Sequence, residues 1–166
     1  MADMLRGRIE HRMAAADAVN QTPHLDNAMR RVIEMARAIR IEAGLPVDYW
    51  EFAVRYAVMM INRLGVGKSA DPLGRSPLTR WTGRASSADG WHVFGCEAMV
   101  EYKSHEREGG KMGAVAPASN GRLRYVGPDS GPGFVSQGHR VLDTAPTGGG
   151  PPRLRVRKNC RFNENM

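Results

Sequence analysis

Hydrophobic residues recur at helical spacing in the first third of the chain. From residue 24 to residue 43 they return every three or four positions, and charged side chains occupy positions between them. This spacing predicts an amphipathic helix over 24–43. The predicted apolar stripe consists of Leu25, Met29, Val32, Ile33, Ala36 and Ile39. Gly44 and Pro46 follow, and these residue types are typical of a helix end and of a new helix start.

A second helix is predicted over 48–64. It is apolar on nearly all sides, and only a thin stripe of Glu51, Arg55 and Asn62 is polar. A helix of this kind is expected to be buried against other elements. Asp48 and Glu51 have the spacing of a capping box, which would satisfy the first backbone N–H groups of the helix.

Glycine and proline are concentrated in the second half of the chain, where they favour short strands joined by turns. In the last predicted strand, Leu154 and Val156 alternate with three arginines, so the two kinds of side chain should lie on opposite faces. The fold class is α+β, with N-terminal helices followed by a small β-barrel or a partly closed sheet. We further expect a helix over 4–17, a linker over 65–90 with a short helix at 77–82, and strands near 91–103, 122–127, 133–143 and 153–162.

The chain is basic, with 24 Lys and Arg residues against 17 Asp and Glu residues and a net charge of +7. The excess is largest near the C-terminal end, where five of the nine residues 153–161 are Arg or Lys. A basic excess favours polyanionic partners, although a solvated basic surface is the simpler alternative.

Two cysteines are too few for a disulfide framework. Cys96 lies in an apolar run and is expected to be a small core residue. The cysteine usage predicts a reducing compartment, nuclear or cytoplasmic. No stretch reaches the roughly 20 apolar residues needed to span a bilayer, and the N-terminus lacks the apolar run of a secretory signal. We expect no membrane association and no cofactor.

A series of short motifs follows one another in a fixed order. They are EMAR at 34–37, AGLP at 43–46, INRL at 61–64, SP at 76–77, WTG at 81–83 and VFGCEAMV at 93–100. Trp50, Ala53 and Ala57 fall at matching positions between them. In order and spacing this set closely resembles the integrase of copia-type retrotransposons. A weaker likeness continues through 122–127 and 140–145 to 153–162.

The resemblance implies an architecture. In that family the two helices end a ribonuclease-H-like catalytic core, and the following strands form a small barrel similar to a Src-homology-three (SH3) fold. The resemblance thus divides the chain into an unassigned helical segment at 1–21, the end of an integrase core with a linker at 22–90, and a barrel at 91–162.

The family's reaction joins element DNA to target DNA, and three carboxylates hold two metal ions that activate the attacking hydroxyl. The position of the third carboxylate falls on Asp26. The stretch before it is too short for the strands that carry the other two. Asp26 is therefore either a shortened metal ligand or, more simply, a helix N-cap or a plain surface residue. We expect no metal site and no enzymatic activity.

DNA contact is the activity that the residues still predict. Arginine suits phosphate oxygens, and few aromatic residues are placed to read bases, so weak, non-specific backbone contact is expected. The candidates are Arg30, Arg31, Arg37 and Arg40 on the first helix, and Arg153, Arg155, Arg157, Lys158 and Arg161 near the C-terminal end. Pairing of Arg30 and Arg37 with Glu34 within the helix is an equally good explanation of the first group.

The sequence therefore predicts a fragment of a copia-type integrase that binds nucleic acid and lacks catalytic power. One alternative is a non-catalytic protein-interaction module, and another is an inert transposon remnant. Because the second helix is apolar nearly all round, self-association through an exposed apolar face is also expected.

Overall fold

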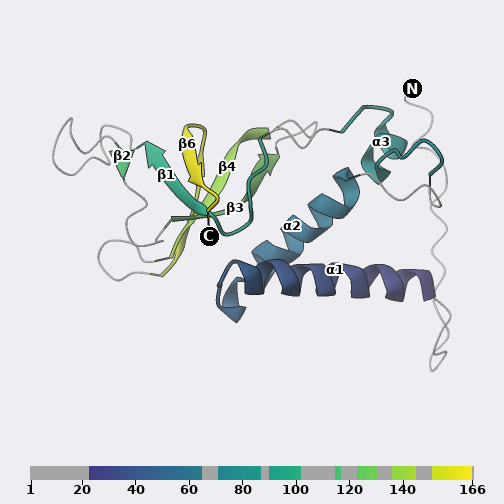
Figure 1. Cartoon of the computed structure of the whole chain (residues 1–166), viewed down its shortest axis with the longest axis horizontal. Coiled ribbons are helices and arrows are strands. Elements are labelled where there is room, and N and C mark those ends of the chain that lie inside the picture. The colour runs from purple at the N-terminus through teal and green to yellow at the C-terminus, as the bar shows by residue number, and fades with distance from the viewer. Residues whose placement is uncertain are drawn as a thin grey trace.

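The structure is a computed structural model that describes residues 23–64, 71–86, 90–101, 115–116, 123–130, 136–144 and 151–165. The predicted α+β class is confirmed: helices come first along the chain, and an antiparallel sheet follows. Figure 1 shows the helices at one end of the molecule and the sheet at the other. The helix predicted over 4–17 lies outside the described residues.

Helix α1 spans Pro23–Glu42, close to the predicted 24–43. It ends where Gly44 takes a left-handed backbone, with φ +62°, a conformation that suits glycine at a helix C-terminus. Of the simpler alternatives for Asp26, the N-cap is wrong, because Asp26 lies inside the first turn of α1, while its exposure agrees with a plain surface residue. There its charge favours the helix by interacting with the positive end of the helix dipole.

The second helix begins later than predicted. A 3-10 turn, η2, covers Val47–Tyr49, and helix α2 then runs over Trp50–Arg63. Tyr49 occupies the N-cap position with no side-chain hydrogen bond, so the predicted capping box is wrong. The extra turn separates Asp48 from the backbone N–H groups that it would have capped.

The two helices meet at the turn over residues 43–46 and diverge from there (Figure 1). Near the turn, Ala36 of α1 and Ala53 and Ala57 of α2 are buried in one cluster. Farther from the turn, α1 loses this cover: Leu25, Met29 and Ile33 are 56%, 55% and 50% exposed. Half of the predicted apolar stripe therefore has no packing partner in the described part of the chain.

The short helix predicted at 77–82 is confirmed as α3, Pro77–Thr82. Ser76 is its N-cap and accepts a hydrogen bond from the Thr79 backbone N–H, and Pro77 sits at the start, where its missing N–H costs nothing. Gly83, with φ +71°, ends the helix. These signals are local, which is why the sequence predicts this helix well.

The sheet contains β1 (Glu97–Glu101), β2 (Val115–Ala116), β3 (Leu123–Ser130), β4 (Ser136–Asp143), β5 (Arg153–Arg157) and β6 (Cys160–Asn163). Its order is β2-β1-β3-β4-β5, and β6 also pairs with β1. All pairs are antiparallel. The single strand predicted over 153–162 is wrong, because residues 158–159 break it into β5 and β6.

Of the two expected forms, a small barrel or a partly closed sheet, the described strands do not form a closed barrel. In the described residues β6 pairs with β1 at one end of the sheet and β5 pairs with β4 at the other, with no pairing between β5 and β6. The face of β5 that would line the interior of a closed barrel carries arginines. Burying them in an apolar interior would require a partner for each charge, which opposes closure.

A close contact joins the helices to the sheet. Gly95, with φ +78°, lies so near Ala43 that a Cβ built on Gly95 would be 2.3 Å from the Ala43 Cβ. Its backbone N–H donates to the Tyr125 carbonyl over 2.7 Å, which fixes it against β3. Cys96 beside it is fully buried, as predicted, in a cluster shared by α1, α2, β3 and β4. A second cluster lies within the sheet and contains Ala98, Val100, Leu123 and Val141.

Candidate nucleic-acid interface

Three of the four candidate arginines on α1 are exposed. Arg30, Arg31 and Arg37 face solvent, and Arg30 donates to the Asn27 Oδ1 over 2.8 Å. The described residues form no ion pair between Glu34 and either Arg30 or Arg37, although the sequence spacing would allow one. These three guanidinium groups are therefore open to an anionic partner.

Arg40 differs from the other three. It is half-buried, and its Nη1 donates to the Leu45 carbonyl over 2.7 Å. This bond ties the end of α1 to the turn that leads into α2. Arg40 was predicted as a DNA contact together with Arg30, Arg31 and Arg37, and the structure gives it this turn-stabilising bond instead of a free position.

The arginines of β5 lie on the inner face of the open sheet. Directly opposite residues in an antiparallel pair share a face, and Arg155 is opposite Val141, which is buried in the sheet cluster. Arg157 is likewise opposite His139. Both arginines are half-buried. Leu154 and Val156 lie on the other face and are exposed. The predicted alternation is thus confirmed, but the arginines occupy the more covered side.

A buried carboxylate lies among these arginines. Asp143 on β4 is fully buried, and its Oδ2 is 3.8 Å from the Nη2 of Arg155. A carboxylate without solvent is stable only beside cations or hydrogen-bond donors. Arg155 therefore contributes charge that the folded sheet itself needs.

The remaining predicted contacts near the C-terminal end are exposed. Arg153 lies at the start of β5, Lys158 in the turn between β5 and β6, and Arg161 on β6 opposite Met99. The first half of α1, which carries Arg30 and Arg31, points away from the sheet (Figure 1). These two arginines are therefore separate from the exposed cations of the sheet.

Sequence reasoning missed a groove of about 590 Å³ between α2, α3 and the strands β3 and β4. Among the described residues its lining includes Arg55, Arg63 and Arg140 and no Asp or Glu. Trp81 of α3 stands at this groove and is 84% exposed. Trp81 belongs to the WTG motif, but no pattern along the chain connects α2 with residues 126–128 and 140.

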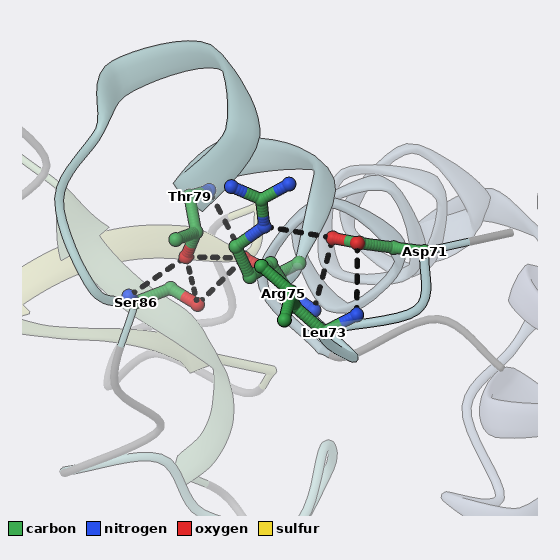
Figure 2. A network of polar contacts seen from close by, with 6 residues as sticks. Asp71, Leu73, Arg75, Thr79 and Ser86 are labelled. Carbon is green, nitrogen blue, oxygen red and sulfur yellow. Dashed lines mark hydrogen bonds and ion pairs between the residues drawn. The ribbon is translucent and has the colours of Figure 1, made fainter. Parts of the chain in front are cut away.

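A hydrogen-bond network holds α3 beside the end of α2 (Figure 2). The Asp71 carboxylate accepts from the Leu73 and Arg75 backbone N–H groups and from the Arg75 Nε. The Arg75 hydrogen bond is the main reason that the pKa of Asp71 falls below its usual value. On the other side, the Ser86 hydroxyl donates to the Arg63 carbonyl over 2.8 Å and the Ser86 N–H donates to the Thr79 Oγ1. The wall that carries Trp81 is therefore fixed at both ends.

An aromatic cluster fills the inner face of the sheet near β6. His92 stacks on Phe162 with ring centroids 3.7 Å apart, and its Nδ1 lies 2.9 Å from the Glu164 carboxylate. Burial lowers the pKa of His139, and the nearby His92 lowers it further. The Tyr125 hydroxyl is buried without a hydrogen-bond partner among the described residues, and burial raises its pKa.

The cysteines are not activated as nucleophiles. Burial raises the pKa of the Cys96 thiol to about 12 and that of Cys160 to about 11. Both thiols therefore stay protonated, and unreactive, near neutral pH. Among the residues that the structure describes, no three His, Cys, Asp or Glu side chains are grouped as a metal site.

The described helices include none with the length and apolar character required to cross a bilayer. By fold, the chain is an α+β protein in which a helical pair packs on an open antiparallel sheet. Comparisons with protein-family models, with curated proteins and with solved structures give no match to this chain.

Proposed function

We propose that the chain is a non-catalytic, nucleic-acid-binding segment of a copia-type retrotransposon integrase. One observation carries the binding role: Arg30, Arg31 and Arg37 project from α1 and form no ion pair with any carboxylate in the described part of the chain. Guanidinium groups free of carboxylates are suited to phosphate oxygens. Arg153, Lys158 and Arg161 supply a second, smaller set of exposed cations.

The family assignment is supported by how the motif residues meet in space. Ala43 begins the AGLP motif and Gly95 lies in the FGC motif, and these two residues are in van der Waals contact. Ser76 and Gly83, from the SP and WTG motifs, cap the two ends of α3. The motif residues therefore have structural roles, in the contact between the helices and the sheet and at the ends of α3. Such roles are expected if the chain has the fold of the family.

The sheet is proposed to be an opened form of the family's SH3-like barrel. The two strands at the ends of the order β6-β1-β3-β4-β5 are neighbours in sequence, separated by only residues 158–159. A strand order whose ends are joined by a short turn is the order that a small barrel needs. Helices α1 and α2 would then be the remnant of the ribonuclease-H-like core.

Salt dependence tests the binding role. A labelled DNA duplex should bind weakly, without sequence preference, with a log–log salt slope of roughly −3 to −5 if most of the exposed cations contact phosphates. Binding that does not change with salt would contradict the proposal. A duplex of unrelated sequence serves as the control and should bind equally well.

The absence of catalysis is tested separately. Neither nicking nor joining of DNA is expected with magnesium or manganese, since Asp26 acts as an ordinary acid in the first turn of α1. Metal-dependent joining that is lost in Asp26→Ala would overturn the non-catalytic assignment.

A second candidate function, a protein-interaction module, is favoured by the uncovered half of α1. Leu25, Met29 and Ile33 lie on one face and are at least half exposed. Because about half of each side chain is already covered, burying the rest would contribute about 1 kcal/mol each, which favours self-association or a partner helix. Sedimentation should then show an oligomer that Met29→Ser and Ile33→Ser convert to a monomer, whereas Val47→Ser, on the exposed turn, should not.

A further inference from the structure

The groove between α2, α3, β3 and β4 combines an exposed aromatic ring with positive charge. Trp81 is 84% exposed, while a second exposed tryptophan, Trp50, lies outside this groove. Tryptophan is one of the largest apolar side chains, so leaving it uncovered sacrifices a large part of the burial energy that it could provide. An uncovered indole beside a groove is a feature of binding surfaces.

The position of Trp81 is fixed before any partner arrives. Its helix is capped by Ser76 and Gly83, and the Ser86 hydroxyl ties the following segment to the Arg63 carbonyl. The backbone that carries the indole therefore does not have to be ordered on binding, which removes part of the entropy cost of a complex.

The charge of the groove restricts the chemistry of its occupant. In the part of the chain that the structure describes, its lining contains three arginines and no carboxylate. Arg55 pairs with Glu51 over 2.7 Å and Arg140 pairs with Asp129 over 3.1 Å, but both pairs are at least partly open to solvent. The Arg55–Glu51 pair is solvent-exposed, and exposed pairs contribute little stability, so Arg55 can exchange its partner for a phosphate at small cost. The Arg140–Asp129 pair is half-buried, so the same exchange costs more at Arg140.

We propose that this groove binds single-stranded nucleic acid, with an unpaired base stacked on Trp81 and the adjoining phosphates held by Arg55 and Arg140. A nucleotide combines a flat ring with an anion, which matches an exposed indole beside arginines. A duplex could not use the ring, because its bases are stacked on each other. An apolar peptide would offer no anionic group to the arginines. The inference rests on the proposed nucleic-acid binding and deepens it, because it names the strand form and a site outside the predicted arginines.

The test compares two oligonucleotides that have equal charge. One is a labelled thymidine octamer, and the other is an abasic octamer with the same phosphates and no bases. Wild-type protein should bind the thymidine octamer more tightly. Trp81→Ala should weaken thymidine binding about tenfold, a typical effect of removing one stacking ring, and should change abasic binding less than about twofold. Trp50→Ala, the matched control, should change neither.

Arginine variants sharpen the test. Arg55→Gln should weaken binding of both octamers and flatten the salt slope by about one unit. Arg80→Gln removes an exposed arginine from α3 that does not line the groove, and it should leave both unchanged.

The outcomes separate this inference from the wider proposal. If neither octamer nor a duplex binds, the proposed function fails. If nucleic acid binds but Trp81→Ala has no effect, or if wild-type protein binds both octamers equally, the groove is not the site and only the inference fails. Loss of self-association in Trp81→Ala with unchanged thymidine binding would assign the groove to a second copy of the chain and would likewise overturn it.

Discussion

The helical pair and the sheet treat their arginines in opposite ways. On α1, Arg30, Arg31 and Arg37 stand in solvent beside apolar side chains that are also uncovered. On β5, Arg155 and Arg157 lie on the covered face, while Leu154 and Val156 point outward. The same residue type is thus available to a partner in one region and is used by the fold in the other. Counting basic residues along a chain cannot distinguish these two uses.

The largest loss of stability is expected from a substitution that disturbs the contact between the helical pair and the sheet. Gly95→Ala should destabilise the protein by about 3 kcal/mol, because its positive φ disfavours a side chain and its Cβ would overlap Ala43. Gly90→Ala is the control: its φ is +74°, but a Cβ there meets nothing within 4 Å, so only about 1 kcal/mol is expected. Urea unfolding measures both. Equal losses would show that the Ala43 contact is unimportant.

A smaller loss of stability should distinguish the arginines of the sheet. Asp143→Ala removes the carboxylate beside Arg155 and should destabilise the fold by about 2 kcal/mol, less than for a fully buried pair, since Arg155 is partly exposed. Adding Arg155→Met should restore part of the loss. Arg30→Ser on α1 should change the free energy of unfolding by less than about 0.5 kcal/mol. If Asp143→Ala were as harmless as Arg30→Ser, the contrast between the two regions would disappear.

For DNA binding, substitutions of the α1 arginines should have a larger effect than substitutions of the β5 arginines. Replacing Arg30, Arg31 and Arg37 with Ser should flatten the log–log salt slope by about 2–3 units, since each lost phosphate contact removes about 0.9. Replacing Arg153, Arg155 and Arg157 should flatten it by about one unit, because only Arg153 of these three is exposed and the other two are half-buried. Titration of each triple variant against one duplex at several salt concentrations measures this. A larger change in the β5 variant would place the main interface on the sheet.

The smallest effect concerns pH. Burial, and then His92, lower the pKa of His139 in the folded protein below its ordinary value of 6.5. The unfolded chain therefore binds the proton more readily, so the stability from this group is complete above pH 6.5 and is lost as pH falls below it. Arg157 opposite and Phe162 beside His139 face the same ring. The fall in unfolding free energy between pH 7.5 and pH 5.5 should be smaller in His139→Gln, and an unchanged fall would contradict this account.

Local signals explain how much of this fold the sequence predicts. Helix α3 is bounded by Ser76, Pro77 and Gly83, each of which acts within one turn, and its limits are predicted without error. The start of α2 is not, because the 3-10 turn at Val47–Tyr49 depends on how the chain leaves α1. The break between β5 and β6 is equally invisible, since it follows from β6 pairing with distant β1.

The candidate sites follow the same division. Exposure of Arg30, Arg31 and Arg37 follows from helical spacing, which fixes the side opposite the apolar stripe. In β5, alternation separates Arg155 from Leu154 but does not state which face is covered. The groove at Trp81 cannot be predicted from the sequence, because its arginines come from α2 and β4 and meet only in the folded chain.

The pairing of β1 with β6 has a consequence for the order of folding. Ala98 pairs with Phe162, and these residues are far apart in the chain, whereas α1 with α2 and the 71–86 segment are built from near neighbours. Closing a long loop costs conformational entropy and is therefore slow. The helical pair and the 71–86 segment should form first, and β6 should dock late. Until it docks, β1 presents an unpaired strand edge that other chains can extend. The rate at which β6 arrives would therefore govern how much of the protein is lost to aggregation during refolding.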